Sequence, residues 1–196
     1  MANDTTAYIS IPIIEAMIFR VEQGDSDIEY ENVIKAMSSS ILNYYFPLVN
    51  GFLVVLTSEQ NQNQSHDYDY GYGSRVFRIR RHCPDSRGIV DHTVTVVETE
   101  KRVDPSSLEA SLERLENALE NSESTTGVGR CWALLIRGVE FMFYEYQQNR
   151  PGNHRLLPWG SPDQPERNVY HVRRDAETID WMLRQMIQQD TPPIRP

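Results

Sequence analysis

The sequence has little cysteine, no long hydrophobic run and no N-terminal targeting pattern. Its two cysteines, Cys83 and Cys131, fit neither a disulfide framework nor a zinc motif, so we expect reduced thiols. No apolar run approaches the roughly 20 residues of a transmembrane helix, and the N-terminus has Asp4 but no basic segment of a signal peptide. We therefore expect an intracellular protein, cytoplasmic or nuclear, that does not engage a membrane.

Lysine is scarce, and positive charge is outnumbered. The chain has 19 basic and 28 acidic residues, a net charge of -9, which argues against sequence-blind binding of nucleic acid over the whole surface. One basic groove is still compatible with that charge. Only Lys35 and Lys101 are lysines, and the arginine excess is typical of surface ion pairing or of genome base composition, with anion recognition as the alternative.

The chain does contain enough apolar residues for one folded domain. Hydrophobic residues make up 39% of 196 positions, sufficient for a core without disulfides or metals. We expect an N-terminal helical extension at 1–26 and an α/β core at 27–148. We expect residues 149–196 to form an irregular proline-rich segment and a C-terminal helix that pack on this core.

Hydrophobic periodicity predicts an α/β fold in which helices flank a mixed central sheet. Apolar residues at helical spacing predict helices at residues 8–22, 27–45, 105–121 and 175–189. Runs rich in β-branched and aromatic residues predict strands at 51–57, 75–81, 89–101, 131–136 and 139–146, the third of them central. Residues 61–74 interleave tyrosine and glycine with polar residues, which is typical of a long loop.

The last two predicted strands are expected to form an aromatic hairpin at an edge of the sheet. Trp132, Phe141 and Phe143 belong to strands that are apolar on both faces, so both faces need cover. Residues 156–159 and the helix at 175–189 offer cover within the chain, and a second copy related by a two-fold axis is the alternative. The expected state is a monomer or a homodimer.

Two carboxylates lie close together near the end of the predicted third strand. Side chains two positions apart on a strand share a face about 7 Å apart, which places Glu98 with Glu100 and Lys101 on the opposite face. The same alternation predicts His92 on the face of Glu98 and Asp91 on the other. Paired carboxylates suit Mg²⁺, which can activate water for phosphodiester hydrolysis.

With these residues in place, the sequence resembles the PD-(D/E)XK nuclease-like superfamily, also called restriction-endonuclease-like. Pro84-Asp85 is followed after twelve residues by Glu98-Thr99-Glu100, and the similarity covers roughly residues 27–137. The stretch 132–146 is also similar to uncharacterised fungal proteins of this architecture. The motif is degenerate, because Glu100 stands where the family carries lysine and Lys101 follows one residue late.

The resemblance implies an αβββαβ core and a particular set of site residues. It implies catalytic roles for Asp85, Glu98, Glu100 and Lys101, if the protein is active. It further implies that Mg²⁺ would be held by Asp85, Glu98 and Glu100, with Glu31 as an additional, helix-borne ligand. In an inactive protein the resemblance implies no cofactor.

Arg78 and Arg80 on the neighbouring strand have two interpretations. Their spacing allows them to pair across the sheet with Glu98 and Glu100 in an ion-pair ladder. Alternatively, they point away and line a groove for nucleic-acid phosphates. The first interpretation favours a non-catalytic interaction or regulatory module with an unknown protein partner. The second favours a Mg²⁺-dependent nuclease that cleaves DNA or RNA.

Overall fold

The computed structural model describes residues 7–24, 27–57, 74–83, 88–99, 106–120, 129–151 and 154–193, and the structural statements below concern these residues. Its helices are α1 (Pro12–Gln23), α2 (Asp27–Tyr45), α3 (Ser106–Glu120) and α4 (Ala176–Gln188), with 3-10 turns η1 (Tyr8–Ser10) and η2 (Leu48–Asn50). Its strands are β1 (Phe52–Thr57), β2 (Arg75–Cys83), β3 (Gly88–Glu98), β4 (Arg130–Arg137), β5 (Glu140–Gln147), β6 (Leu156–Pro158) and β7 (Val169–His171). Every predicted helix and strand has its counterpart, whereas β6 and β7 are additional. The predicted loop at 61–74 lies outside the described residues except for Ser74.

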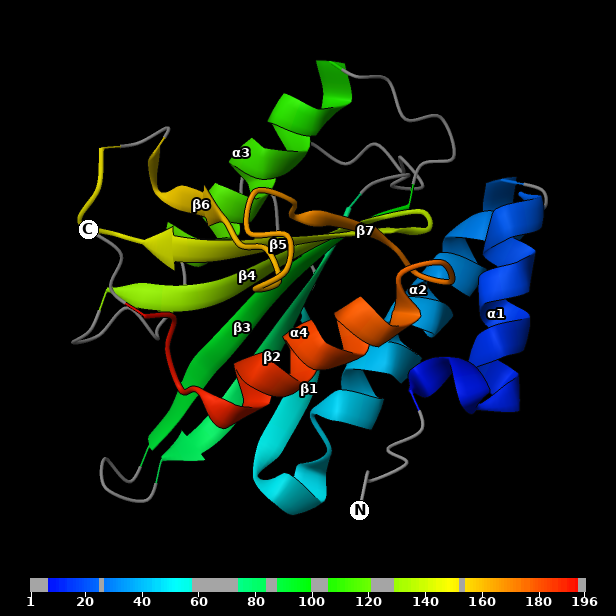
Figure 1. Cartoon of the computed structure of the whole chain (residues 1–196), viewed down its shortest axis with the longest axis horizontal. Coiled ribbons are helices and arrows are strands. Elements are labelled where there is room, and N and C mark those ends of the chain that lie inside the picture. Colours follow the sequence, from blue (N-terminus) through cyan, green and yellow to red (C-terminus); the bar gives the residue numbers. More distant parts are fainter. Residues whose placement is uncertain are drawn as a thin grey trace, which may run out of the picture.

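The strands form one seven-stranded mixed sheet. Its order is β1-β2-β3-β4-β5-β6, with β7 also pairing with β5. β3 and β4 run parallel, and the other pairs are antiparallel. Figure 1 shows α3 on one face and α4 with α2 on the other, while α1 packs against α2. The predicted class, a mixed α/β sheet flanked by helices, is confirmed. Among the described helices none is both long and apolar enough to cross a membrane.

Successive side chains of the sheet belong to two separate hydrophobic clusters, one on each face. Val96 and Leu135 pack with Leu115 and Leu119 on the face that α3 covers. On the opposite face, Val97 belongs to the larger cluster that α1, α2 and α4 share. The leucine stripe predicted at 105–121 is thus the buried side of α3, because successive residues of a strand alternate between faces and both faces are covered.

The prediction that the aromatic hairpin forms a sheet edge is wrong. β4 and β5 do pair as a hairpin, but β5 is bordered on its other side by β6 and β7. Trp132, Phe141 and Phe143 are fully buried, and Trp159 packs against Trp132 with ring centroids 4.5 Å apart and the ring planes tilted by 45°. Residues after the hairpin therefore cover its aromatic side chains within the same chain. The longer edge strand of the sheet is β1, at the opposite end, and no described strand pairs with its outer side.

An irregularity between β2 and β3 reverses the predicted side-chain directions at the start of β3. Ile79 pairs with Thr93 but Arg80 pairs with Asp91, so His92 is an extra residue without a cross-strand partner. Such a bulge interrupts the alternation of faces. Asp91 consequently lies on the α3 face, where Arg78 contacts both Asp91 and the Ala118 carbonyl of α3. The predictions that placed Asp91 opposite Glu98 and His92 beside Glu98 are wrong for this reason.

Candidate functional site

Glu98 ends β3 next to the first turns of α3, where an arginine holds its carboxylate. Arg114 of α3 donates from Nη1 to both carboxylate oxygens of Glu98, at 2.9 and 3.0 Å. On the parallel neighbour β4, Arg137 is in register with Glu98 and donates to the Ser107 hydroxyl at 2.6 Å. Glu98 is buried, so its negative charge is compensated where β3, β4 and α3 meet.

Arg78 and Arg80 pair with Asp91, and not with Glu98 as the expected ladder required. Arg78 Nη1 and Arg80 Nε donate to the two oxygens of Asp91 at 2.8 and 3.0 Å. The Asp91 side chain is 1% exposed, against 12% for Arg78 and 33% for Arg80. The bulge at His92 explains this change of partner, because it turns Asp91 onto the face of both arginines. Sequence spacing alone gave no sign of it.

The remaining residues of the predicted site divide into one described carboxylate and three undescribed positions. Glu31 of α2 forms ion pairs with Lys35, one helical turn on, and with Arg75 of β2 at 3.4 Å. Asp85, Glu100 and Lys101 lie outside the described residues.

The carboxylates of Glu31, Asp91 and Glu98 do not converge on one point. Asp91 and Glu98 share the α3 face but are separated by roughly 20 Å along β3. Arg75, the partner of Glu31, is in register with Val97, which faces the α2 side of the sheet. Within the described ranges, no three His, Cys, Asp or Glu side chains are close enough together to hold a metal ion.

His92 is a buried structural side chain on the α2 and α4 face. Its ring contacts the rings of Phe46 and Phe52 at centroid distances of 5.7 and 5.3 Å. Its Nε2 lies 3.2 Å from the Gln189 carbonyl, and Nδ1 lies 2.8 Å from the Thr93 hydroxyl. Burial, assisted by the charge of Arg81, lowers the pKa of His92 to about 4, so the ring is neutral at physiological pH and fastens the end of α4 to the sheet.

Exposed apolar side chains gather along β1 and the turn that precedes it. Leu48 and Val49 of η2 are 74% and 91% exposed, and Leu53 and Leu56 of β1 are 43% and 52% exposed. β1 contains no charged residue, proline or glycine. No described strand pairs with its outer side, so a row of backbone hydrogen-bonding groups faces away from the sheet there.

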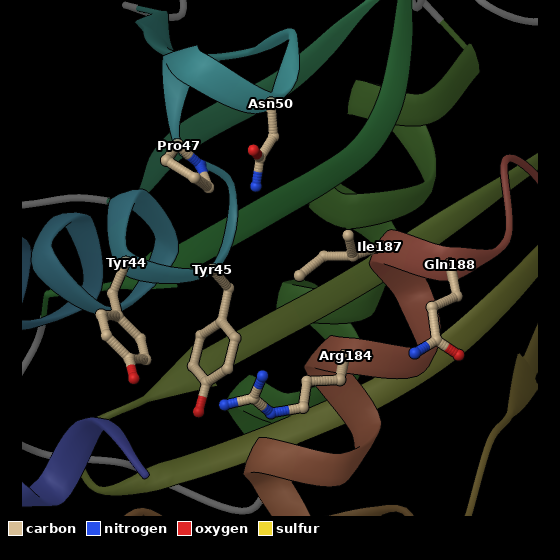
Figure 2. Close-up of a pocket in the computed structure, with 7 residues that line it drawn as sticks. All are labelled: Tyr44, Tyr45, Pro47, Asn50, Arg184, Ile187 and Gln188. Carbon is tan, nitrogen blue, oxygen red and sulfur yellow. The ribbon is translucent and has the colours of Figure 1, made fainter. Parts of the chain in front are cut away.

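A groove of about 340 Å³ lies between the C-terminal ends of α2 and α4. Its lining residues are Tyr44, Tyr45, Pro47, Asn50, Arg184, Ile187 and Gln188. Figure 2 shows the Arg184 guanidinium at one end of the groove and the Asn50 side chain at the other, with Ile187 reaching in from the side. The sequence analysis missed this groove. Only the spacing of Asp180 and Arg184, four residues apart on a predicted helix, was visible beforehand.

A buried tyrosine and an aspartate fix the position of Arg184. The Tyr45 hydroxyl donates to Asp180 Oδ1 at 2.5 Å, and Arg184 Nε donates to Asp180 Oδ2 at 2.8 Å. Burial and the hydrogen bond to Asp180 raise the pKa of the Tyr45 hydroxyl above its usual range, so it remains a donor. No protein-family model, curated protein or solved structure matches this chain.

Proposed function

We propose that this protein is a non-catalytic interaction module on a nuclease-like α/β fold. The order α2, β1, β2, β3, α3, β4 supports such a fold, because it follows the αβββαβ order of the superfamily that the sequence resembles. The antiparallel arrangement of β1, β2 and β3, followed by a helical crossover to the parallel strand β4, is consistent with the same core.

The ion pairs of the described acidic residues argue against metal-dependent catalysis. A Mg²⁺ site needs carboxylate oxygens that converge on the ion. Glu98 instead gives both oxygens to Arg114, and Glu31 gives Oε1 to Lys35 and Arg75 on the other face of the sheet. To bind Mg²⁺, each carboxylate would first have to give up its cationic partner, and the nuclease alternative thus gains no support from these residues.

The observation that carries the proposal is the uncharged edge strand β1, which has exposed leucines and no described strand on its outer side. Natural edge strands are usually blunted by charges, prolines, bulges or a covering segment, because an open apolar edge recruits further strands. β1 has neither charge nor proline, and its two leucines are exposed on opposite faces. This edge therefore suits pairing with a strand of another protein molecule, a common mode of protein recognition.

A second copy of the chain is the occupant that the pattern of β1 fits. When two copies of β1 pair antiparallel about a two-fold axis through Val54, Leu53 lies opposite Val55 of the partner subunit. In the same register, Leu56 lies opposite Phe52 of the partner subunit, so both exposed leucines gain an apolar cross-strand neighbour. Because β1 is uncharged, this register places no like charges opposite each other although each chain carries -9.

Light scattering on the full chain across the micromolar range tests this proposal. We expect the mass of a dimer for the wild type and a shift toward the monomer, by at least tenfold in dissociation constant, for Leu56→Glu. The substitution would set a carboxylate against the Phe52 ring of the partner subunit twice in each dimer. A monomeric wild type would overturn the pairing through β1.

Ile13→Glu is the matched control. Ile13 is 65% exposed on α1, which lies apart from β1 in Figure 1, and the substitution adds the same charge. This variant should remain dimeric. If it dissociates as readily as Leu56→Glu, net charge and not the β1 edge controls association, and the assigned interface is wrong.

A further inference from the structure

The groove between α2 and α4 has one charged lining residue, and its other lining residues supply both apolar and uncharged polar surface. Arg184 is the single charged side chain among the seven that line it. Tyr45, Pro47 and Ile187 supply apolar surface at its sides, and the amide of Asn50 lies across from the guanidinium (Figure 2). A volume of about 340 Å³ is at the lower end of the range for ligand pockets, so the groove fits a small molecule or a single side chain.

Arg184 is held so that part of its hydrogen-bonding capacity remains available. Its Nε is used by Asp180, whose other oxygen accepts from Tyr45, and Tyr45 is buried. The two terminal nitrogens of Arg184 donate to none of the described residues, and the side chain is 34% exposed. The arginine is thus oriented before any ligand arrives, which lowers the entropy lost on binding.

We propose that this groove binds a small carboxylate with an apolar body. Two parallel N–H donors on a planar cation match the two oxygens of a carboxylate, and such bidentate pairs are stronger than neutral hydrogen bonds. Tyr45, Pro47 and Ile187 would contact the body of the ligand, and Asn50 offers a donor and an acceptor to its far end. The site is separate from the dimer proposal, since neither Leu53 nor Leu56 lines the groove.

An NMR titration of the full-length protein with benzoate tests the site. We expect saturable amide shifts in residues 48–50 and 184–188, with at least tenfold weaker binding of benzamide, which has the same shape without the charge. N-acetylphenylalanine is a second probe. Tighter binding of this probe than of benzoate assigns the site to a peptide C-terminus, and the reverse assigns it to a free acid. Either result supports a carboxylate site.

Variants connect this binding to Arg184. Arg184→Gln should abolish the benzoate shifts, and Arg184→Lys, which keeps the charge but loses the planar fork, should weaken binding several-fold. Arg174→Gln is the matched control, because it removes an arginine from the segment preceding the opposite end of α4. Asn50→Ala changes an exposed, uncharged residue and should weaken benzoate binding about threefold. This variant keeps the proposal testable if the Arg184 variants unfold.

Four results would overturn the proposal. These are the absence of saturable benzoate shifts, equal binding of benzamide, unchanged binding by folded Arg184→Gln, and saturation by inorganic phosphate but not by benzoate. Loss of binding in the Arg174→Gln control would also count against it, because the shifts would then report general charge. None of these results depends on whether β1 forms a dimer.

Discussion

The ring of His92 occupies an apolar environment that the sequence around it does not predict. Phe46 and Phe52 pack against it, and Arg81 contributes a nearby positive charge. Protonating this ring in the folded protein would place a cation in that environment, which is why burial lowers its pKa. The same residue is the extra one of the β-bulge, so a single position sets both the face of Asp91 and the anchoring of α4.

The lowered pKa of His92 predicts a loss of stability in acid. The unfolded chain takes up a proton near pH 6.5, whereas the folded protein resists protonation until about pH 4. The contribution of His92 to the free energy of unfolding is therefore complete above pH 6.5 and declines by up to about 3 kcal/mol as the pH falls to 4. Urea denaturation of the wild type and of His92→Gln at several pH values measures this difference. Identical slopes of stability against pH in the two proteins would contradict the assignment.

At the scale of elements, the short strands β6 and β7 depend on a tight turn between them. A Cβ on Gly160 would lie 2.3, 2.4 and 2.7 Å from the backbone oxygens of Gln164, Arg167 and Pro165. Backbone atoms cannot rotate away as a side chain can, so accommodating a methyl group there requires the turn to open. Trp159 and the cover over β5 belong to the same segment.

Gly160→Ala should therefore destabilise the protein by about 2 kcal/mol or more. Gly51→Ala is a matched comparison, since Gly51 has a φ of +81° but no atom within 4 Å of the added Cβ. Only the backbone preference is lost at that position, at a cost of roughly 1 kcal/mol. Chemical denaturation midpoints rank the two variants, and a larger loss in Gly51→Ala would show that the turn relaxes easily.

At the scale of the whole molecule, charge is distributed over separate ion pairs. Glu98 pairs with Arg114 at one end of β3, Asp91 pairs with two arginines at the other end, and Glu31 pairs with cations on the opposite face. The chain thus has more acidic than basic residues, but the described carboxylates do not gather at one point. This distribution is one reason why we propose recognition, and not phosphodiester chemistry, as the role of the protein.

Calorimetry with Mg²⁺ tests this whole-molecule view. We expect the wild type to show no saturable heat of Mg²⁺ binding that depends on Glu98, because Arg114 already occupies both oxygens of that carboxylate. Glu177→Ala, at an exposed carboxylate in the first turn of α4, changes the net charge by the same amount and controls for general changes in surface charge. Tight Mg²⁺ binding that is lost in Glu98→Ala alone would restore the nuclease alternative.

The sequence by itself determined the longer helices and strands of this protein and its α/β class. Helical and strand periods depend on neighbouring residues, and the predicted helix at 27–45 coincides with α2 while the predicted leucine stripe is the buried side of α3. The break between the predicted strands at 131–136 and 139–146 contains Gly138, whose φ of +57° in the β4–β5 turn is a conformation that suits glycine.

Only the tertiary structure decided which groups meet. The bulge depends on how β2 and β3 align, so no local pattern indicates that His92 lacks a partner or that Asp91 joins Arg78 and Arg80. The true edge depends on β6 and β7, strands of three residues that are too short to show a period. The groove of Arg184 joins ends of helices that are far apart in sequence, and contacts of that kind are set by packing of the whole chain.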